Sequence, residues 1–351
     1  MMNVDASAHS PIAAPVSEAA DPSSVTPVST PSASDDKAPS KARARMVLAV
    51  KVLVTVGALA YTFSRMKLDD LQGAVLRLTA SAFAIAVGLT LLNLVVAAIR
   101  WRVLLAAYGA KDVPNIAFLS RAQLVGFFYN TFVPGNVTGD VLRGHATRAC
   151  FDGPLGAYMV VGLERFFGLA GLFSLGAVGL FVHPLPGIRA DLLAVGALVM
   201  ALGIGLIPVV GRQVGRFLPG RIGKWASNLP AVSRPSLLLV VVVMSLVTQA
   251  IVGLTGHVLL ASITPQVSTL ESLVLVPLAM IATYMPLSVA GLGVREAAFV
   301  FVFAKVAVAR PDATAASLAF FAVCAVVAGL GGLTHLLAPL QLAPAPEKTA
   351  S

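Results

Sequence analysis

Long apolar runs, separated by short polar connections, occupy most of the chain. Runs of about 18 or more apolar residues are long enough to cross a bilayer as helices. The chain is 57% hydrophobic and 12% charged, whereas a soluble domain is typically about 45–50% apolar and about 25% charged. We therefore predict an all-α fold, a polytopic membrane helix bundle, with helical segments at 46–64, 81–99, 114–133, 155–182, 192–210, 237–259, 272–289, 297–308 and 316–337.

Two of these segments do not fit a simple crossing. The run at 114–133 contains Arg121 and leads into a stretch rich in glycine and proline. The run at 297–308 would be only about 18 Å long, which is too short to span. We predict that both belong to re-entrant helical hairpins broken by Gly and Pro.

The ends of the chain differ from its middle. Residues 1–45 are rich in Pro, Ser and Ala and contain no aromatic residue, so they cannot bury enough apolar surface to fold. They also lack the basic and apolar regions of a secretory signal, so the first membrane helix is expected to direct insertion. We predict a disordered cytosolic tail at 1–45, a transmembrane domain at 46–340 and a short C-terminal tail at 341–351.

The net charge of +9 lies mainly in connections between apolar runs, which excludes a nucleic-acid partner and indicates an orientation signal. The connection at 212–235 carries five cations and no acid. The first run is preceded by basic residues, and the second is followed by Arg100, Arg102 and Lys111. All three basic regions fall on the cytoplasmic side only if 114–133 enters the bilayer and turns back. The sequence thus predicts a multi-pass protein with a cytoplasmic N-terminus.

The first broken segment reads FVPGNVTGDVLRG, at 132–144. Pro134 cannot continue a helix, and Gly135 and Gly139 permit backbone conformations that other residues resist. Irregular backbone at membrane depth is tolerated only where protein or water surrounds it. This segment is therefore predicted to face the interior of the bundle.

A new helix is expected to follow this break. Thr138 or Asp140 would cap it, and its free N–H groups would suit a phosphate. Arg143 lies three residues after Asp140, so both side chains are expected on one face of that helix.

A second segment, TYMPLSVAGLGVREAAFVFVF at 283–303, repeats these ingredients about 150 residues later. Paired Gly/Pro-interrupted segments in two halves of a membrane protein indicate a transport site. We expect the two broken segments to meet inside the bundle around a polar pocket that binds an anion. The second segment contributes Pro286, Gly291, Gly293, Arg295 and Glu296.

Charged residues also occur within an apolar run, at Glu164 and Arg165. A lone charge near the bilayer centre costs at least about 2.5–3.5 kcal/mol, so such residues pair or face a polar cavity. Two interpretations stay open for this pair and for Arg121: a ligand site, or ion pairs that only hold helices together. The glycines at 168, 171, 176, 179, 329, 331 and 332 are interpreted as sites of close helix packing.

Other chemistry is not apparent in the sequence. Five scattered histidines and two cysteines provide no metal-ligand spacing or disulfide framework. No nucleophile–base constellation or phosphate-binding loop is recognisable, and the GLG at 291–293 lacks the rest of a dinucleotide fingerprint. We expect no catalytic residue, no metal and no cofactor.

Four motifs together resemble the lysylphosphatidylglycerol synthase transmembrane-region family, also called flippase-like. They are LNLVVAAIRWRVLL (92–105), FFYNTFVPGNVTGDVLRGHATR (127–148), GLERFFGL (162–169) and MPLSVAGLGVREAA (285–298). The resemblance implies a bundle with re-entrant helices that moves lipids between leaflets. It implies a stand-alone, flippase-like domain without an aminoacyl-transfer domain, since we expect only a short tail after the last span.

The resemblance also implies a set of functional residues. Substrate-binding residues would be Asn130, Asn136, Asp140, Arg143, Glu164, Arg165, Arg295 and Glu296. Structural breaks would be Pro134, Gly135, Gly139, Pro286, Gly291 and Gly293. Thr138 stands where the family usually has a second glycine before the aspartate, which would tighten the turn.

Our leading hypothesis is a non-enzymatic lipid translocase of the bacterial inner membrane, for an anionic, polyprenyl or hopanoid-type lipid. Arg143 and Arg295 would bind the head group, and Asp140 and Glu296 would orient them. Three alternatives stay open: an enzyme acting on a lipid phosphate with Asp140 as its base, a transporter of a small anionic solute, and a scaffold. The expected partners are membrane lipids and, as a further class, lipid-biosynthesis enzymes.

Overall fold

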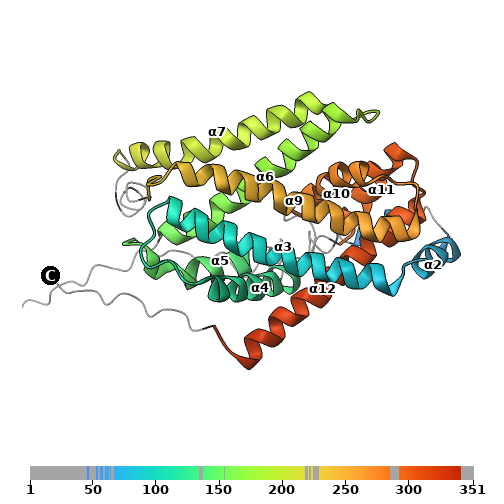
Figure 1. Ribbon diagram of the computed structural model, residues 1–351, viewed down its shortest axis with the longest axis horizontal. Helices are drawn as coiled ribbons and strands as arrows, with labels where there is room; N and C mark the ends of the chain where they lie inside the picture. The colour runs from blue at the N-terminus through green and yellow to red at the C-terminus, as the bar shows by residue number, and fades with distance from the viewer. Residues whose placement is uncertain are drawn as a thin grey trace, which may run out of the picture. The chain divides into compact units, whose positions relative to one another are not determined.

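The computed structural model describes residues 46, 53, 56–57, 60–62, 64, 67–133, 137–153, 155–217, 220, 223, 229–284 and 292–340. These residues form helices, with no strand among them, which confirms the predicted fold class. Figure 1 shows their arrangement. The helices are α2 Leu68–Leu76, α3 Ala80–Ala107, α4 Ile116–Phe132, α5 Thr138–Ala146, η1 Arg148–Cys150, α6 Leu155–Val182, α7 Ala190–Gly215, α9 Ser236–Ile263, α10 Thr269–Tyr284, α11 Val294–Phe303, η3 Ala304–Val306 and α12 Arg310–Leu337.

The hydrophobic runs predicted these helices well. Within the described part of the chain, α3, α6, α9 and α12 are each long and apolar enough to cross a membrane. The bounds predicted for α6 are the observed ones, and α2 is a short helix that the apolar pattern did not predict. Both predicted tails lie outside the described residues, as do most residues of the first predicted span.

Capping side chains fix several of the helix ends. Thr79 accepts a hydrogen bond from the backbone of Ala82 at the start of α3, and Asn115 does the same for Phe118 at the start of α4. Ser268 and Glu271 bond each other's backbone N–H groups where α10 begins. Such bonds satisfy donors that a helix start leaves free.

One end of the bundle, which we call the Arg234 end, gathers connections that are distant in sequence. The backbone N–H of Lys111 donates to the carbonyl of Cys150 at 2.7 Å, and that of Ser233 donates to Ala107 at 2.8 Å. Arg102 also donates to the carbonyl of Pro114 at 3.2 Å. These bonds place the end of α3, the start of α4 and the end of α5 close together.

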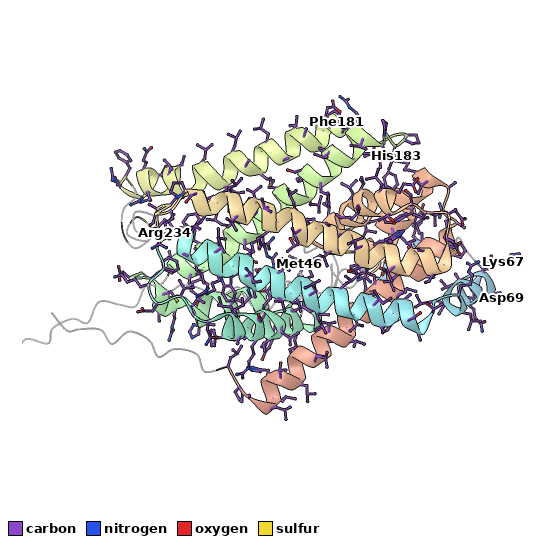
Figure 2. The ribbon with its side chains drawn as sticks, viewed as in Figure 1. Met46, Lys67, Asp69, Phe181, His183 and Arg234 are labelled. Atoms are coloured by element: carbon purple, nitrogen blue, oxygen red, sulfur yellow. The ribbon has the colours of Figure 1, made fainter. Side chains whose placement is uncertain are left out.

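The opposite end, which we call the His183 end, is joined in the same way. Asp312 forms an ion pair with Arg77 and accepts a hydrogen bond from Thr264 at 3.0 Å. His183 lies 3.9 Å from Glu271. Figure 2 shows Arg234 at one end of the helices and His183 at the other.

Two helical hairpins extend from these opposite ends. In the α4–α5 hairpin, α4 begins and α5 finishes at the Arg234 end. In the α10–α11 hairpin, α10 begins beside His183, and α11 leads through η3 back to the same end. Figure 1 shows the two hairpins towards opposite ends of α3 and α9. The structure contains no membrane, so re-entry into one face of the bilayer stays a prediction.

Each hairpin belongs to its own hydrophobic core. The core around α4 and α6 includes Trp101, Leu119 and Phe167. The core around α10, α11 and α12 includes Phe299 and Leu275. The two cores give each hairpin a separate rigid support.

Glycines allow α12 to pack closely against α4. A Cβ atom on Gly331 would overlap the backbone carbonyl of Leu124, and one on Gly332 would press on the ring of Phe128. The interpretation of these two glycines as packing sites is therefore confirmed. It is wrong for Gly329, where a Cβ would have nothing within 4 Å.

We expect Gly331→Ala to destabilise the bundle by about 1–3 kcal/mol, because the added methyl group would push against backbone that cannot move aside. Gly329→Ala is the matched control, and it should be neutral or slightly stabilising because alanine favours a helix. The measurement is the apparent thermal unfolding midpoint in detergent. Equal midpoints for the two variants would contradict the close α4–α12 contact.

Candidate functional site

Five charged side chains from three helices form what we call the α5–α6 charge cluster. They are Arg100 of α3, Asp140 and Arg143 of α5, and Glu164 and Arg165 of α6. Four of the five are predicted site residues. Because these helices come from separate parts of the chain, the cluster exists only in the folded bundle.

Glu164 is the centre of this cluster. One of its carboxylate oxygens accepts a hydrogen bond from Arg100 at 3.0 Å, and the other accepts one from Arg143. Arg100 also donates to Ser245 at 3.3 Å and to Thr248 at 3.2 Å, both on α9. Glu164 is 3% exposed, so its charge depends on these two guanidinium groups rather than on water.

Asp140 is the second acceptor of the cluster. It accepts a hydrogen bond from Arg165, lies 3.6 Å from Arg143, and accepts from the amide of Asn130 at 3.3 Å. The oxygen of that amide accepts from the backbone N–H of Gly139 at 2.8 Å. Asn130 therefore ties the end of α4 to the start of α5 and orients Asp140. As predicted, Asp140 and Arg143 lie on one face of a helix.

The start of α5 differs from the prediction in one respect. Its N-cap is Val137, and neither Thr138 nor Asp140 caps the helix with its side chain. The carboxylate of Asp140 is instead bound by the side chains described above. Gly139 lies inside the helix, where a Cβ atom would overlap the carbonyl of Gly126. It is needed for close approach of the two helices rather than for an unusual backbone angle.

The α5–α6 charge cluster has more positive than negative charge. It contains three guanidinium groups and two carboxylates. Within the described structure, the Nε–H groups of Arg100 and Arg143 are buried without a hydrogen-bond partner. The guanidinium carbon of Arg143 lies 4.4 Å from the ring centroid of Trp101, which holds it from one side. The cluster can therefore accept one further negative charge.

The second predicted site forms a smaller group, which we call the α11–α12 charge cluster. Arg295 forms an ion pair with Glu296 and donates to Ser317 of α12 at 3.1 Å. Glu296 is fully buried and accepts from the backbone N–H of Gly293 at 2.6 Å. Gly293 has a φ of 80°, as its predicted role in a break requires. One guanidinium and one carboxylate make this cluster neutral.

The printed contacts of the two clusters involve different residues and different helices. Among the described residues, no hydrogen bond or ion pair joins one cluster to the other. Glu164 lies about 14 Å along α6 from its start at the Arg234 end, and Ser317 about 10 Å along α12 from its start at the His183 end. The expectation that both segments share one pocket stays a prediction, because parts of both broken segments lie outside the described residues. The predicted residues Pro134, Gly135, Asn136, Pro286 and Gly291 lie outside the described residues.

Arg100 is the site residue that the sequence argument missed. Because the predicted segment ends at residue 99, the sequence places Arg100 with Arg102 in the basic connection that follows. In the structure α3 continues to Ala107, so Arg100 is 8% exposed and lies within the helix. The signal for this was present in the apolar pair Leu104 and Leu105, which extends the apolar run beyond the arginine.

Cysteine chemistry has no support near this site. Burial, reinforced by the negative charge of Asp112, raises the pKa of the Cys150 thiol. The thiol is therefore protonated at neutral pH and a poor nucleophile. The described residues also contain no group of three His, Cys, Asp or Glu side chains suited to a metal ion.

We expect Glu164→Gln to lower stability by about 3–5 kcal/mol, because it leaves two buried guanidinium groups without their shared counter-charge. Asp152→Asn is the control: Asp152 pairs with Lys111 where their side chains are 84% and 67% exposed, and such pairs contribute little. Apparent unfolding midpoints in detergent measure both effects. A midpoint for Glu164→Gln equal to that of the control would show that Glu164 does not hold the cluster together.

Comparison with known proteins agrees with the motifs. The family described as lysylphosphatidylglycerol synthase TM region matches residues 48–332, which include both charge clusters. No curated protein matches the chain. Since the match covers most of the chain, this protein belongs to the lysylphosphatidylglycerol synthase TM region family.

Proposed function

We propose that this membrane protein moves a lipid with a negatively charged head group between the two leaflets of the membrane. The observation that carries the proposal is the α5–α6 charge cluster, where three guanidinium groups, those of Arg100 and Arg143 buried and that of Arg165 partly exposed, face two carboxylates. A phosphate-bearing head group would supply the missing negative charge. Polyprenyl and hopanoid-type lipids with such a group fall within the same class.

Head-group binding would work by exchange of ion pairs. A buried guanidinium is costly when unpaired, so the resting protein holds Arg143 against Glu164 and Asp140. An arriving phosphate would take over part of these contacts and use the free Nε–H of Arg143. The charge on the arginine would then remain paired throughout the exchange, which would keep the energy barrier to head-group binding low.

A lipid suits the surroundings of the cluster better than a soluble solute does. The helices that carry or contact these charges inside the bundle expose large apolar side chains elsewhere, such as Val178 and Phe181 of α6 and Leu239 of α9. Lipid tails could stay against these apolar faces while the head group passes along the polar interior. The α11–α12 charge cluster, nearer the His183 end, would be a second head-group binding site on that path.

The charges at the two ends of the protein support one orientation, and we propose the bacterial inner membrane as its location. The Arg234 end would be cytoplasmic, because cations there outnumber acids and positive charge favours that side. The described cations at this end are Arg102, Lys111, Arg148, Arg212, Arg216 and Arg234, and the acids are Asp112 and Asp152. The His183 end has as many acids as cations, with Lys67, Arg77, Arg189, Lys305 and Arg310 against Asp69, Asp70, Asp191, Glu271 and Asp312.

We expect Arg143→Gln combined with Arg295→Gln to slow lipid movement by about tenfold or more, because each change removes charge-assisted hydrogen bonds to the head group. The measurement is the rate at which a fluorescent anionic lipid in proteoliposomes becomes accessible to a reductant that cannot cross the membrane. Lys111→Gln, which removes an exposed cation at the Arg234 end, is the matched control.

The same samples test the alternatives. Size-exclusion elution and helical circular dichroism must match wild type before the rates are compared. Equal rates in folded wild type and double variant would remove the mechanism. Recovery of chemically altered lipid would instead favour an enzyme, because translocation leaves every covalent bond intact.

A further inference from the structure

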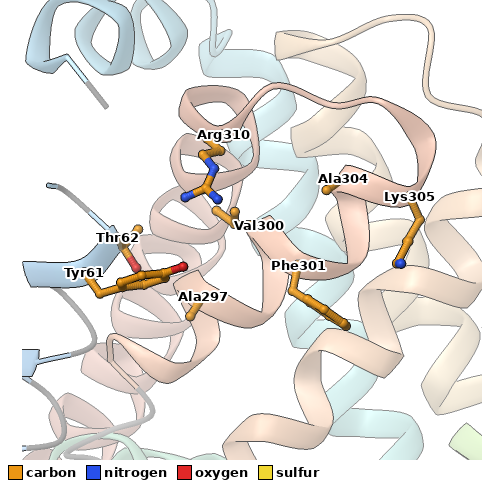
Figure 3. A pocket seen from close by; sticks show the side chains of 8 residues that line it. All are labelled: Tyr61, Thr62, Ala297, Val300, Phe301, Ala304, Lys305 and Arg310. Carbon is orange, nitrogen blue, oxygen red and sulfur yellow. The ribbon is translucent and has the colours of Figure 1, made fainter. Parts of the chain in front are cut away.

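A cavity lies beside α11, away from the contacts of the α11–α12 charge cluster. Its volume is about 450 Å³, within the range of about 300–1,000 Å³ that is typical of small-molecule sites. It is bounded by α11, η3, the first residue of α12 and the pair Tyr61 and Thr62 (Figure 3). None of its lining residues contributes to either charge cluster.

The floor of this cavity is one apolar face of α11. Ala297, Val300, Phe301 and Ala304 line it, and their spacing of three, four and seven residues places them on one side of a helix. The alanines at either end leave room beside the helix, and Phe301 is 68% exposed. Such a strip is suited to an extended hydrocarbon chain.

Two cations lie around this apolar face. Figure 3 shows the guanidinium of Arg310 beside Val300, on the side of Thr62, and Lys305 on the far side of Phe301. The Lys305 ammonium is 5.5 Å from the ring centroid of Phe301. Arg310 is also the first residue of α12, where the free N–H groups of a helix start favour a negative charge.

Two acids at this end are engaged with other arginines. Asp312 pairs with Arg77, and Asp191 pairs with Arg189. In the described part of the chain, neither Lys305 nor Arg310 forms an ion pair. The cavity therefore combines positive charge that has no ion-pair partner among the described residues with an apolar floor.

We propose that this cavity binds an anionic phospholipid, with its phosphate beside Arg310, one acyl chain along the α11 face, and Lys305 adding positive charge on the far side of Phe301. The hydroxyl of Tyr61, which also lines the cavity, can donate to a phosphate oxygen. A soluble anion would leave the apolar floor unused, whereas a phospholipid occupies both parts. This site is separate from the α5–α6 charge cluster and does not require transport.

The test uses tryptophan fluorescence at the cavity itself. Phe301→Trp places a reporter on the α11 face, and its signal is read after subtracting that of the two native tryptophans. The protein is reconstituted in vesicles where either phosphatidylglycerol or phosphatidylcholine carries brominated, quenching acyl chains. We expect the site to prefer phosphatidylglycerol, and the preference to fall about tenfold in Lys305→Gln plus Arg310→Gln.

Controls separate charge at the site from charge at the surface. Arg189→Gln removes a cation at the same end of the bundle and should keep the preference. Excess inorganic phosphate should not relieve quenching, since it cannot replace the acyl chain. Relief by phosphate would identify a soluble-anion site and overturn the lipid proposal.

Two further results would also overturn it: equal quenching by both lipids, or a preference that survives the double substitution. Native mass spectrometry of the chain with Phe301 intact gives a second readout, the number of phosphatidylglycerol molecules retained with and without Lys305 and Arg310. Equal retention would contradict the proposal even if the tryptophan variant did not fold. Neither readout depends on lipid movement, so a failed translocation assay would leave this result standing.

Discussion

A carboxylate shared between two buried guanidinium groups is the interaction on which this bundle depends. In a membrane interior, a charge is tolerated only when it is paired and hydrogen-bonded. Glu164 meets that demand for Arg100 and Arg143 together, and the bonds from Arg100 to Ser245 and Thr248 extend the network to α9. These polar contacts fix the positions of α3, α5, α6 and α9 along one another, which apolar packing alone would not do.

This arrangement also explains why α4 and α5 can approach closely at their broken connection. Gly126 and Gly139 let the two backbones touch, and Asn130 then binds the first turn of α5 while it holds Asp140. The start of a helix leaves backbone N–H groups without helical partners, and the oxygen of Asn130 satisfies that of Gly139. The same residue, Asn130, therefore holds both Asp140 and the first turn of α5 in place.

The helices could be predicted from the sequence because a helix that crosses the bilayer needs about 20 consecutive apolar residues, and such runs can be counted along the chain. The sequence predicted the bounds of α6 directly, and it placed Asp140 and Arg143 on one helix face. It missed Arg100 because a basic residue near the end of an apolar run looks like a loop residue. The spacing of residues along the chain also could not show that the two hairpins start from opposite ends of the bundle. That arrangement depends on contacts between each hairpin and other helices.

The two charge clusters differ in how easily a head group could displace the carboxylates from their arginines. Glu164 and Asp140 are held by side chains alone, in a cluster with one guanidinium in excess. Glu296 binds Arg295 and also the backbone N–H of Gly293 at the start of α11, so displacing it would uncap a helix as well as break an ion pair. If a head group visits both clusters, it should bind first at the α5–α6 charge cluster. Opening the α11–α12 charge cluster would then be the slower step, because it must disturb backbone structure.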